Sequence, residues 1–325
     1  MNKLSRKAKL HISLGIVCMI ILVSLAIVAT GLYRIYYDPA ALFRGDFSRP
    51  DRVEAHFGER VINVLVLGLH NRNEDNTFGE VYFIDTILLA SINFDQDSLT
   101  LLAVPRDSYV EIAHAGEKDR IRQSYSYGFR EGEPDRHEEG LRYAVETAEM
   151  LLDGVAIDYY IAMDLQGLMR LIDSLGGVYY DVEQPMIGFT EQESLSAGPQ
   201  ILDGRGYVNY LTYREPDARD DLNRMNRQKA LLLATFDYFK ERGLFRNVIP
   251  TYTTYRDHID TDLNLNQVAA LTLFAAERLE KDAISEYSLQ GEYFSPDGGD
   301  TYLLRLDEAE KDRLLDQLRG QGSMP

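Results

Sequence analysis

Three apolar runs between Val61 and Tyr109 constrain the fold of this chain more than any other feature. The first is VINVLVLG, the second is IDTILLASINF, and the third is LTLLAVPRDSY. Runs of this length, rich in Val, Ile and Leu and bounded by polar segments, are typical of β-strands. The short turn DQDS separates the last two runs, so we expect them to form an antiparallel hairpin.

The register of this hairpin brings charged residues together at its open end. With the turn near Gln96, residues whose numbers sum to about 192 lie opposite one another. This register places Asp85 close to Arg106 and Asp107. If the first strand runs antiparallel to the second, its end near His70 reaches the same edge. We therefore predict that this edge is the functional site.

The rest of the chain alternates predicted helices with predicted strands. Apolar residues at helical spacing fill 140–154, and IDYYIAM after them is typical of a strand. Asp164 is placed to cap the next helix, which ends before Gly176 and is followed by the strand VYYDV. This alternation indicates an α/β fold with a layered, mixed β-sheet flanked by helices. For any single residue of the apolar helix faces, ordinary core packing is the favoured interpretation, although periodicity alone does not separate a filled core from a channel.

Several less regular segments carry expectations of their own. We expect a long polar loop over 114–140, and a strand over GYVNYLTYR with Arg214 at its exit. The segment 221–240 predicts a helix with Arg224, Arg227 and Gln228 on one face. Asn264 and Gln267 resemble a capping box at the start of another helix, and 302–319 predicts a charged helix.

The N-terminal region has the composition of a membrane anchor. Residues 10–33 contain no Asp, Glu, Lys or Arg, which is long enough for a helix to cross the hydrocarbon core. Lys3, Arg6, Lys7 and Lys9 precede this segment, so the N-terminus is expected to stay cytoplasmic. A cleaved signal peptide shares these features and is the alternative. The expected segments are a cytoplasmic tail (1–9), a transmembrane helix (10–33), a linker (34–58), an extracellular domain (59–295) and a C-terminal helix and tail (296–325).

Composition excludes several classes of protein. The formal net charge of −18 over 325 residues argues against a nucleic-acid-binding surface. The single cysteine, Cys18, excludes an intrachain disulfide. The sequence has no GxSxG, GxxxxGK[ST], HExxH or paired-cysteine motif, so no serine hydrolase, P-loop or zinc signature competes with the predicted edge.

The motifs at this edge resemble the LytR-CpsA-Psr family. The resemblance rests on VPRDSYV after a strand, the Asp-Thr pair of the preceding strand, RIRQSYSYG, and the segments 157–182 and 202–228, in that order. It covers roughly residues 59–290. It implies a membrane-anchored extracellular enzyme that moves a phosphate-linked glycopolymer from a polyprenyl-pyrophosphate carrier to peptidoglycan, using a divalent metal.

The resemblance also implies roles for individual residues. Cleavage of a pyrophosphate needs its negative charge held by cations, and the planar arginine fork binds two phosphate oxygens at once. Arg106 and Arg214 would clamp the pyrophosphate, and Asp107 would orient Arg106 or act near the metal, unless it forms only a structural salt bridge. Asp85 would bind the metal, Mg²⁺ or alternatively Mn²⁺. The expected substrate-binding residues are Arg122, Arg224, Arg227 and Gln228.

Four positions depart from the family pattern. The family usually has Asp at the position of His70, Arg at Phe83, Asn at Arg122 and Arg at Thr212. Arg122 or Arg72 is a candidate to replace the lost positive charge. These departures keep an alternative function open, in which the protein binds polyprenyl-phosphate lipids as a scaffold or regulator of envelope assembly and transfers little.

Overall fold

The structure is a computed structural model. It describes residues 30–31, 33–43, 60–71, 82–132, 134–188, 194–213, 221–296 and 302–321. No helix within these ranges is long and apolar enough to cross a bilayer. Residues 1–29, which hold the predicted cytoplasmic tail and most of the predicted transmembrane segment, lie outside the described ranges.

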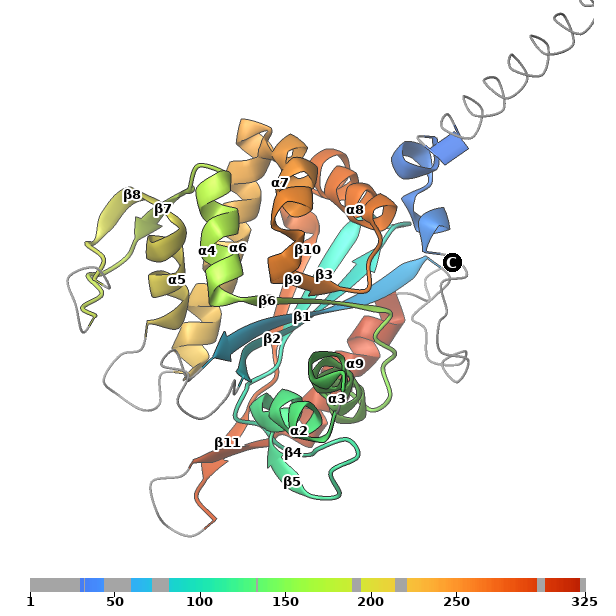
Figure 1. Ribbon diagram of the computed structural model, residues 1–325, viewed down its shortest axis with the longest axis vertical. Helices are drawn as coiled ribbons and strands as arrows, with labels where there is room; N and C mark the ends of the chain where they lie inside the picture. The colour runs from blue at the N-terminus through green and yellow to red at the C-terminus, as the bar shows by residue number, and fades with distance from the viewer. Residues whose placement is uncertain are drawn as a thin grey trace, which may run out of the picture.

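A six-stranded mixed sheet forms the centre of the protein, with the strand order β10-β3-β2-β1-β6-β9 (Figure 1). Its strands are β1 (Val61–Asn71), β2 (Tyr82–Asn93), β3 (Ser98–Ala103), β6 (Tyr159–Asp164), β9 (Ile259–Thr261) and β10 (Ile284–Ser288). The β1–β2, β2–β3 and β6–β9 pairs are antiparallel, whereas β1–β6 and β3–β10 are parallel. The predicted mixed α/β architecture is therefore confirmed.

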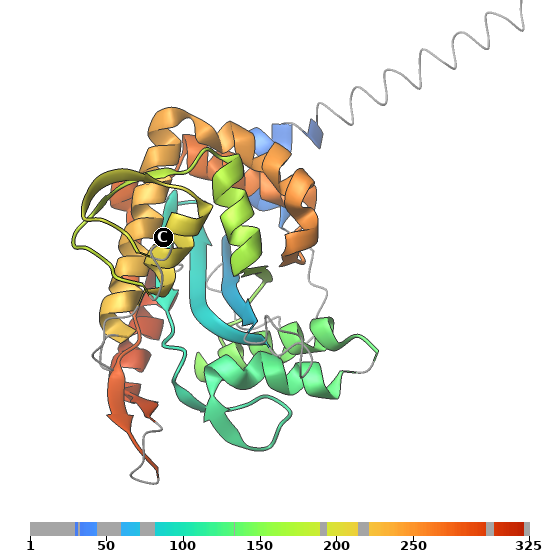
Figure 2. The ribbon, with the colours of Figure 1, turned by 60° about the vertical axis from the view of Figure 1, so that its left-hand side comes forward.

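Helices cover both faces of this sheet, as Figures 1 and 2 show from two sides. One face packs against α2 (Ser124–Glu131), α3 (Arg136–Leu151) and α9 (Glu308–Gln321). The other packs against α6 (Asp221–Arg242) and α8 (Leu265–Glu277). Because both faces are covered, neighbouring residues of β1 are buried alike, with Val64 2% and Leu65 0% exposed. This double burial explains why the strand is a continuous apolar run.

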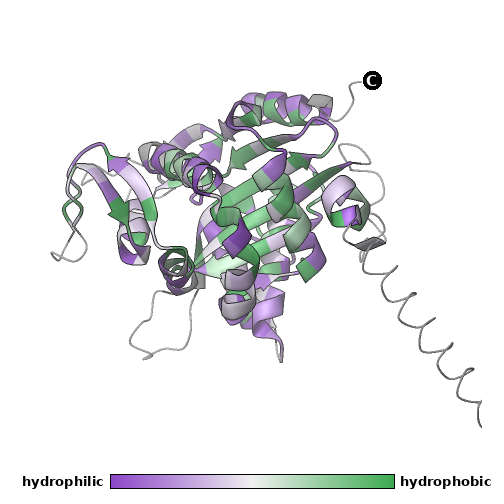
Figure 3. Ribbon diagram, turned by 90° about the horizontal axis from the view of Figure 1, so that it is seen from above, coloured by the Kyte–Doolittle hydropathy of each residue, from purple (hydrophilic) through white to green (hydrophobic). Residues whose placement is uncertain are grey.

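A third apolar cluster lies beside the sheet, where the helices α4 (Leu165–Ser174) and α5 (Gly204–Thr212) pack with α6. The small sheet of β7 (Val178–Val182) and β8 (Gly198–Leu202) completes this cluster. Figure 3 shows apolar residues concentrated in the central strands and polar residues on the outer sides of the surrounding helices. Other helical elements include η1 (Pro39–Leu42), η5 (Leu244–Asn247), α7 (Val248–Tyr255), η6 (Arg256–His258) and η7 (Lys281–Ala283).

The predicted hairpin and helix caps are confirmed. Leu88 pairs with Ala103, which matches the predicted register within one residue. Asn93 Oδ1 accepts hydrogen bonds from the backbone nitrogens of Asp95 and Gln96, at 3.0 Å each, and these bonds shape the turn. Asp164 Oδ1 accepts from Gly167 N at the start of α4, and the predicted capping box opens α8.

The segment GYVNYLTYR was expected to be a strand, and this expectation is wrong because residues 204–212 form α5. Asp203 caps this helix by accepting a hydrogen bond from Gly206 N at 2.7 Å. Gly204 lets α5 approach α4, since a Cβ at this position would lie 2.1 Å from the backbone oxygen of Met169. The cap and this close packing override the strand-like alternation of Tyr and Val. Arg214 lies outside the described residues.

Two further expectations need correction. The polar passage 114–140 is not a simple loop, because it contains the hairpin strand β5 (Lys118–Arg120), the turn η3 (Ile121–Gln123) and α2. Strand β5 pairs with β4 (Tyr109–Glu111), and Tyr125 of α2 is fully buried against α3. The C-terminal segment begins with a strand, β12 (Leu303–Leu306), which pairs with β11 (Gly291–Phe294) before α9 starts.

Candidate functional site

A β-bulge sets Asp85 apart from its neighbours in β2. Gly68 of β1 pairs with Thr86, but the next residue of β1 pairs with Ile84, so Asp85 has no partner opposite it. Bulges of this kind redirect a side chain and are frequent next to active sites. The Asp85 side chain is 20% exposed and points to the edge where Arg106 lies.

The turn after β3 positions Arg106. Both the backbone nitrogen and the hydroxyl of Ser108 donate to Pro105 O, at 3.1 and 2.7 Å, which closes the turn. The guanidinium of Arg106 is only 4% exposed, and its Nη1 donates to Asp85 Oδ1 at 2.7 Å. Arg106 Nε lies 3.7 Å from Asp107 Oδ2. The structure therefore brings together the three residues that the hairpin register predicted.

Arg122 reaches the same carboxylate from η3. Its Nη2 lies 3.0 Å from Asp85 Oδ1, and its guanidinium lies over the Phe83 ring at 5.1 Å. The backbone nitrogen of Arg122 donates to Arg106 O at 3.1 Å, which ties η3 to the turn. Burial lowers the pKa of Arg122, while the Asp85 charge opposes this effect. Arginine remains charged after such a shift, so two guanidinium groups share one carboxylate oxygen.

The surrounding cations hold Asp85 in its ionised form. Burial alone raises the pKa of this carboxyl, but the charges of Arg106 and Arg122 outweigh burial, with smaller contributions from His70 and Arg224. The pKa of Asp85 therefore lies below its usual value. Asp85 is consequently an anchor for cations and a weak proton acceptor.

The three predicted residues of α6 fall into two groups. Arg224 is 4% exposed and lines the same cavity as Asp85 and Arg106. Gln228 Nε2 donates to Leu211 O, and Arg227 Nη2 donates to Tyr213 O, both at 2.9 Å. Arg227 and Gln228 thus brace the end of α5, which forms one wall of the cavity. Gln228 also lines the cavity.

This cavity has a volume of about 320 Å³ and lies between the sheet and the helices α4, α5 and α6. Its walls are mainly apolar, and its apolar lining includes Val66, Leu88, Ala90, Ile161, Leu168 and Leu232. Its charged lining includes Asp85, Arg106 and Arg224. An apolar pocket with a few convergent charged groups suits a ligand that has an apolar body and a charged head. From the sequence, helical periodicity alone did not separate such a cavity from a filled core.

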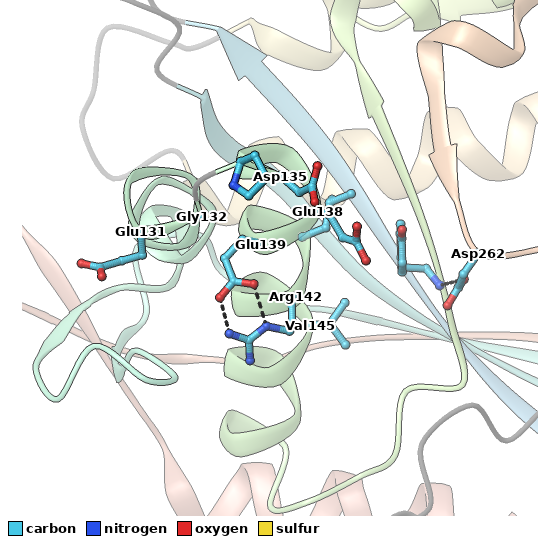
Figure 4. Close-up of a pocket in the computed structure, with 11 residues that line it drawn as sticks. Glu131, Gly132, Asp135, Glu138, Glu139, Arg142, Val145 and Asp262 are labelled. Atoms are coloured by element: carbon cyan, nitrogen blue, oxygen red, sulfur yellow. Dashed lines mark hydrogen bonds and ion pairs between the residues drawn. The ribbon is translucent and has the colours of Figure 1, made fainter.

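A second cavity, of about 660 Å³, lies between the α2–α3 pair and β6 (Figure 4). Five carboxylates line it, those of Glu131, Asp135, Glu138, Glu139 and Asp262. Arg142 is the arginine in this lining, and it is paired with Glu139 as Figure 4 shows. The negative lining of this second cavity disfavours an anionic ligand.

The donors around Asp85 fit a divalent metal poorly. Within the described ranges, no group of three or more His, Cys, Asp and Glu side chains is placed to hold a metal. Asp85 Oδ1 already accepts from two guanidinium groups, and Asp107 lies within 4.0 Å of Arg106 and Arg120. Mg²⁺ prefers an octahedral shell of oxygen atoms. The metal at Asp85 stays a prediction.

The positions that depart from the family pattern have defined environments. His70 pairs with Phe83 across β1 and β2, close to the bulge. Thr212 lies in the exposed wall of the cavity, and its hydroxyl donates to Val208 O at 2.8 Å. Sequence reasoning missed Arg120, which lies 4.0 Å from Asp107, and the role of Phe83 as a platform for Arg122. The arginine pair in RIRQ was the available signal for both.

Comparison with known proteins gives consistent results. Polyisoprenyl-teichoic acid–peptidoglycan teichoic acid transferase TagU of Oceanobacillus iheyensis is 28% identical over 270 residues, which cover 80% of each chain. The protein of the same name from Enterococcus faecalis is 24% identical over 307 residues, which cover 93% of this chain and 94% of its own.

Solved structures share the fold. TagV of B. subtilis superimposes with a TM-score of 0.66 at 21% identity, over 82% of this chain and 98% of its own. TagT bound to LI-WTA superimposes with a TM-score of 0.63 at 22% identity, over 85% of this chain and 96% of its own. The sequence profile of the LytR_cpsA_psr family matches residues 44–320, which is most of the chain. This protein therefore belongs to the LytR-CpsA-Psr family.

Proposed function

We propose that this protein transfers a phosphate-linked glycopolymer from a polyprenyl-pyrophosphate carrier to peptidoglycan. Relatives that align over most of the chain are named as teichoic acid transferases acting from a polyisoprenyl carrier to peptidoglycan. A structural neighbour was solved with LI-WTA bound. These names support a cell-wall glycopolymer as the cargo.

The observation that supports this proposal most strongly is a single cavity that is lined both by apolar side chains and by buried arginines. Its apolar walls suit the polyprenyl chain, which must be shielded from water. Arg106 and Arg224, both buried, suit the pyrophosphate because buried guanidinium groups bind phosphate oxygens strongly. The same lipid thus has its tail and its head accommodated at one place.

The proposed reaction is a phosphoryl transfer. An acceptor hydroxyl of peptidoglycan attacks the glycan-side phosphorus, and a new P–O bond forms. The bond from this phosphorus to the bridging oxygen breaks, and polyprenyl phosphate leaves with that oxygen. Arg106, Arg122 and Arg224, together with Arg214 from the sequence resemblance, hold the charge that develops on the phosphate oxygens.

The acceptor hydroxyl also loses a proton in this step. Asp85 suits this role poorly because its pKa is lowered and its Oδ1 is shared by two arginines. Asp107 lies beside Arg106 and is the carboxylate proposed to take the proton. It also helps to orient Arg106 through their 3.7 Å contact.

The proposed setting is the outer face of the cell membrane. The uncharged segment 10–33 would anchor the chain, and the basic residues before it would keep the N-terminus in the cytoplasm. The catalytic domain would then face peptidoglycan. Protease added to intact protoplasts should digest this domain, and its complete protection would contradict the proposed orientation.

A second candidate function is lipid binding without efficient transfer. It is favoured by Phe83 and Thr212, which place no cation at two positions where the family resemblance implies one. The arginines that remain at the site would still bind the pyrophosphate in its ground state. They would stabilise less of the negative charge that develops on the phosphate oxygens during transfer.

One experiment separates these two functions. The purified protein is incubated with a polyprenyl-pyrophosphate-linked saccharide and peptidoglycan, and both bound lipid and released polyprenyl phosphate are measured. A transferase releases polyprenyl phosphate in step with labelling of peptidoglycan. Stoichiometric lipid binding without release supports the scaffold function, and the absence of both contradicts the two proposals together.

A further inference from the structure

Two arginines converge on one oxygen of Asp85. Arg106 Nη1 lies 2.7 Å and Arg122 Nη2 lies 3.0 Å from Asp85 Oδ1. A carboxylate in a phosphoryl-transfer site commonly holds a divalent cation that neutralises the substrate. Here the space next to Oδ1 already contains two positive charges from the chain itself.

Arg122 is largely buried and is held by contacts on several sides. Its side chain is 17% exposed and lies over the Phe83 ring at 5.1 Å, which favours its charge through a cation–π contact. The backbone of η3 is bonded to the Arg106 turn twice, through Arg122 N to Arg106 O and Ile121 N to Ser108 O. Arg122 and Arg106 are therefore positioned as one unit.

Among the described residues in contact with Asp85 and Asp107, the positive side chains outnumber the negative ones. The guanidinium groups of Arg106, Arg120, Arg122 and Arg224 surround the carboxylates of Asp85 and Asp107. A divalent cation bound to Asp85 would be repelled by Arg106 and Arg122 at close range. The same guanidinium groups attract a pyrophosphate.

We propose that Arg122 supplies, from within the chain, the positive charge beside Asp85 that a divalent metal would supply, so that pyrophosphate binding needs no divalent metal. This inference rests on the proposed function. It assigns Arg122 a direct role toward the phosphate oxygens, with Phe83 as its positioning residue.

Binding of geranylgeranyl diphosphate to the purified full-length protein in detergent tests this proposal. Calorimetric titrations are compared in EDTA and in Mg²⁺, for the native protein and for Arg122→Asn, Arg122→Lys and Arg130→Asn. Arg130 is the matched control, because its guanidinium lies over Tyr127 in α2 and bonds Ser126 O. Thermal unfolding of each variant checks that it is folded.

The native protein should bind with the same Kd in EDTA and in Mg²⁺, within about twofold. Arg122→Asn should weaken binding in EDTA by about 10- to 100-fold, which corresponds to one charge-assisted hydrogen bond. Arg122→Lys should retain the charge and most of the metal independence. Arg130→Asn should match the native protein in both conditions.

Two results would overturn the inference while leaving the proposed function intact. One is native binding that falls at least tenfold in EDTA and recovers with Mg²⁺. The other is a folded Arg122→Asn variant that binds in EDTA as tightly as the native protein. The absence of binding in both conditions would contradict the inference and the proposed function alike.

Discussion

Arg106, in the turn after β3, and Asp85, in β2, are joined by a 2.7 Å contact between Nη1 and Oδ1, and the Arg106 side chain is only 4% exposed. The bulge in β2 and the turn closed by Ser108 both direct these side chains toward one another. This pair connects the other charged residues of the site, because Arg122 contacts Asp85 and Asp107 contacts Arg106.

Replacing Asp85 with asparagine should destabilise the protein measurably. The change leaves Arg106 and Arg122 close together without their shared negative charge, which is expected to cost about 1–3 kcal/mol in the free energy of unfolding. Urea denaturation measures this cost. Asp95→Asn is the control, because the Asp95 side chain is 63% exposed in its contact with Arg60 and should cost about 1 kcal/mol at most. Equal losses in the free energy of unfolding would show that the contacts of Asp85 with Arg106 and Arg122 stabilise the protein no more than an exposed ion pair does.

Adding an arginine at position 83 should bring no gain in affinity. The Phe83 ring lies under Arg122, so Phe83→Arg replaces an attractive contact with repulsion between two guanidinium groups. Thr212→Arg instead places a cation in the exposed wall of the cavity and should tighten geranylgeranyl diphosphate binding severalfold. Tighter binding in Phe83→Arg would mean that Arg122 does not occupy the space of the missing cation.

Filling the cavity should reduce lipid binding at little cost in stability. Ala90 lines the cavity, so Ala90→Leu has room and should cost less than about 1 kcal/mol while weakening polyprenyl phosphate binding severalfold. Ala162 is fully buried in the opposite core cluster and does not line the cavity, so Ala162→Leu should cost about 1–3 kcal/mol. Lipid titration and urea denaturation give the two readouts. Undiminished lipid affinity in a folded Ala90→Leu variant would place the tail elsewhere.

The contact of α5 with α4 predicts different effects at two glycines of the same helix. Gly204→Ala places a Cβ 2.1 Å from Met169 O and should cost about 1–3 kcal/mol. Gly206→Ala meets its nearest atom at 3.3 Å and should be neutral or stabilising by up to about 1 kcal/mol. Thermal unfolding compares the two. A neutral Gly204→Ala would show that the helices separate freely.

The sequence was informative where its signals were local or periodic. The hairpin register placed Asp85 beside Arg106 because the short turn between β2 and β3 fixes which residues of the two segments lie opposite one another. The capping box at Asn264 was readable for the same reason, since its two hydrogen bonds span three residues. The sheet followed from the alternation of strands and helices.

Features that depend on packing between segments far apart in the chain could not be predicted from the sequence. The sequence pattern of α5 predicts a strand, because the close approach of this helix to α4 at Gly204 leaves no periodic signal. The position of Arg122 depends on backbone hydrogen bonds between η3 and the Arg106 turn. The cavity was equally undetermined, because apolar helix faces look the same whether they enclose a space or fill it.

The edge that holds Arg106 is the proposed site of pyrophosphate transfer. The most direct test measures transfer of a labelled glycan from a polyprenyl-pyrophosphate carrier to peptidoglycan by the native protein, by Arg106→Ala and by Arg170→Ala. Arg170 is exposed on α4 and contacts His258 away from the cavity lining, so it is the matched control.

The proposed site predicts that Arg106→Ala lowers the transfer rate by about 10²–10³-fold and weakens pyrophosphate binding, while Arg170→Ala transfers at the native rate. A folded Arg106→Ala variant with native turnover and native affinity would contradict the assignment of this edge as the site.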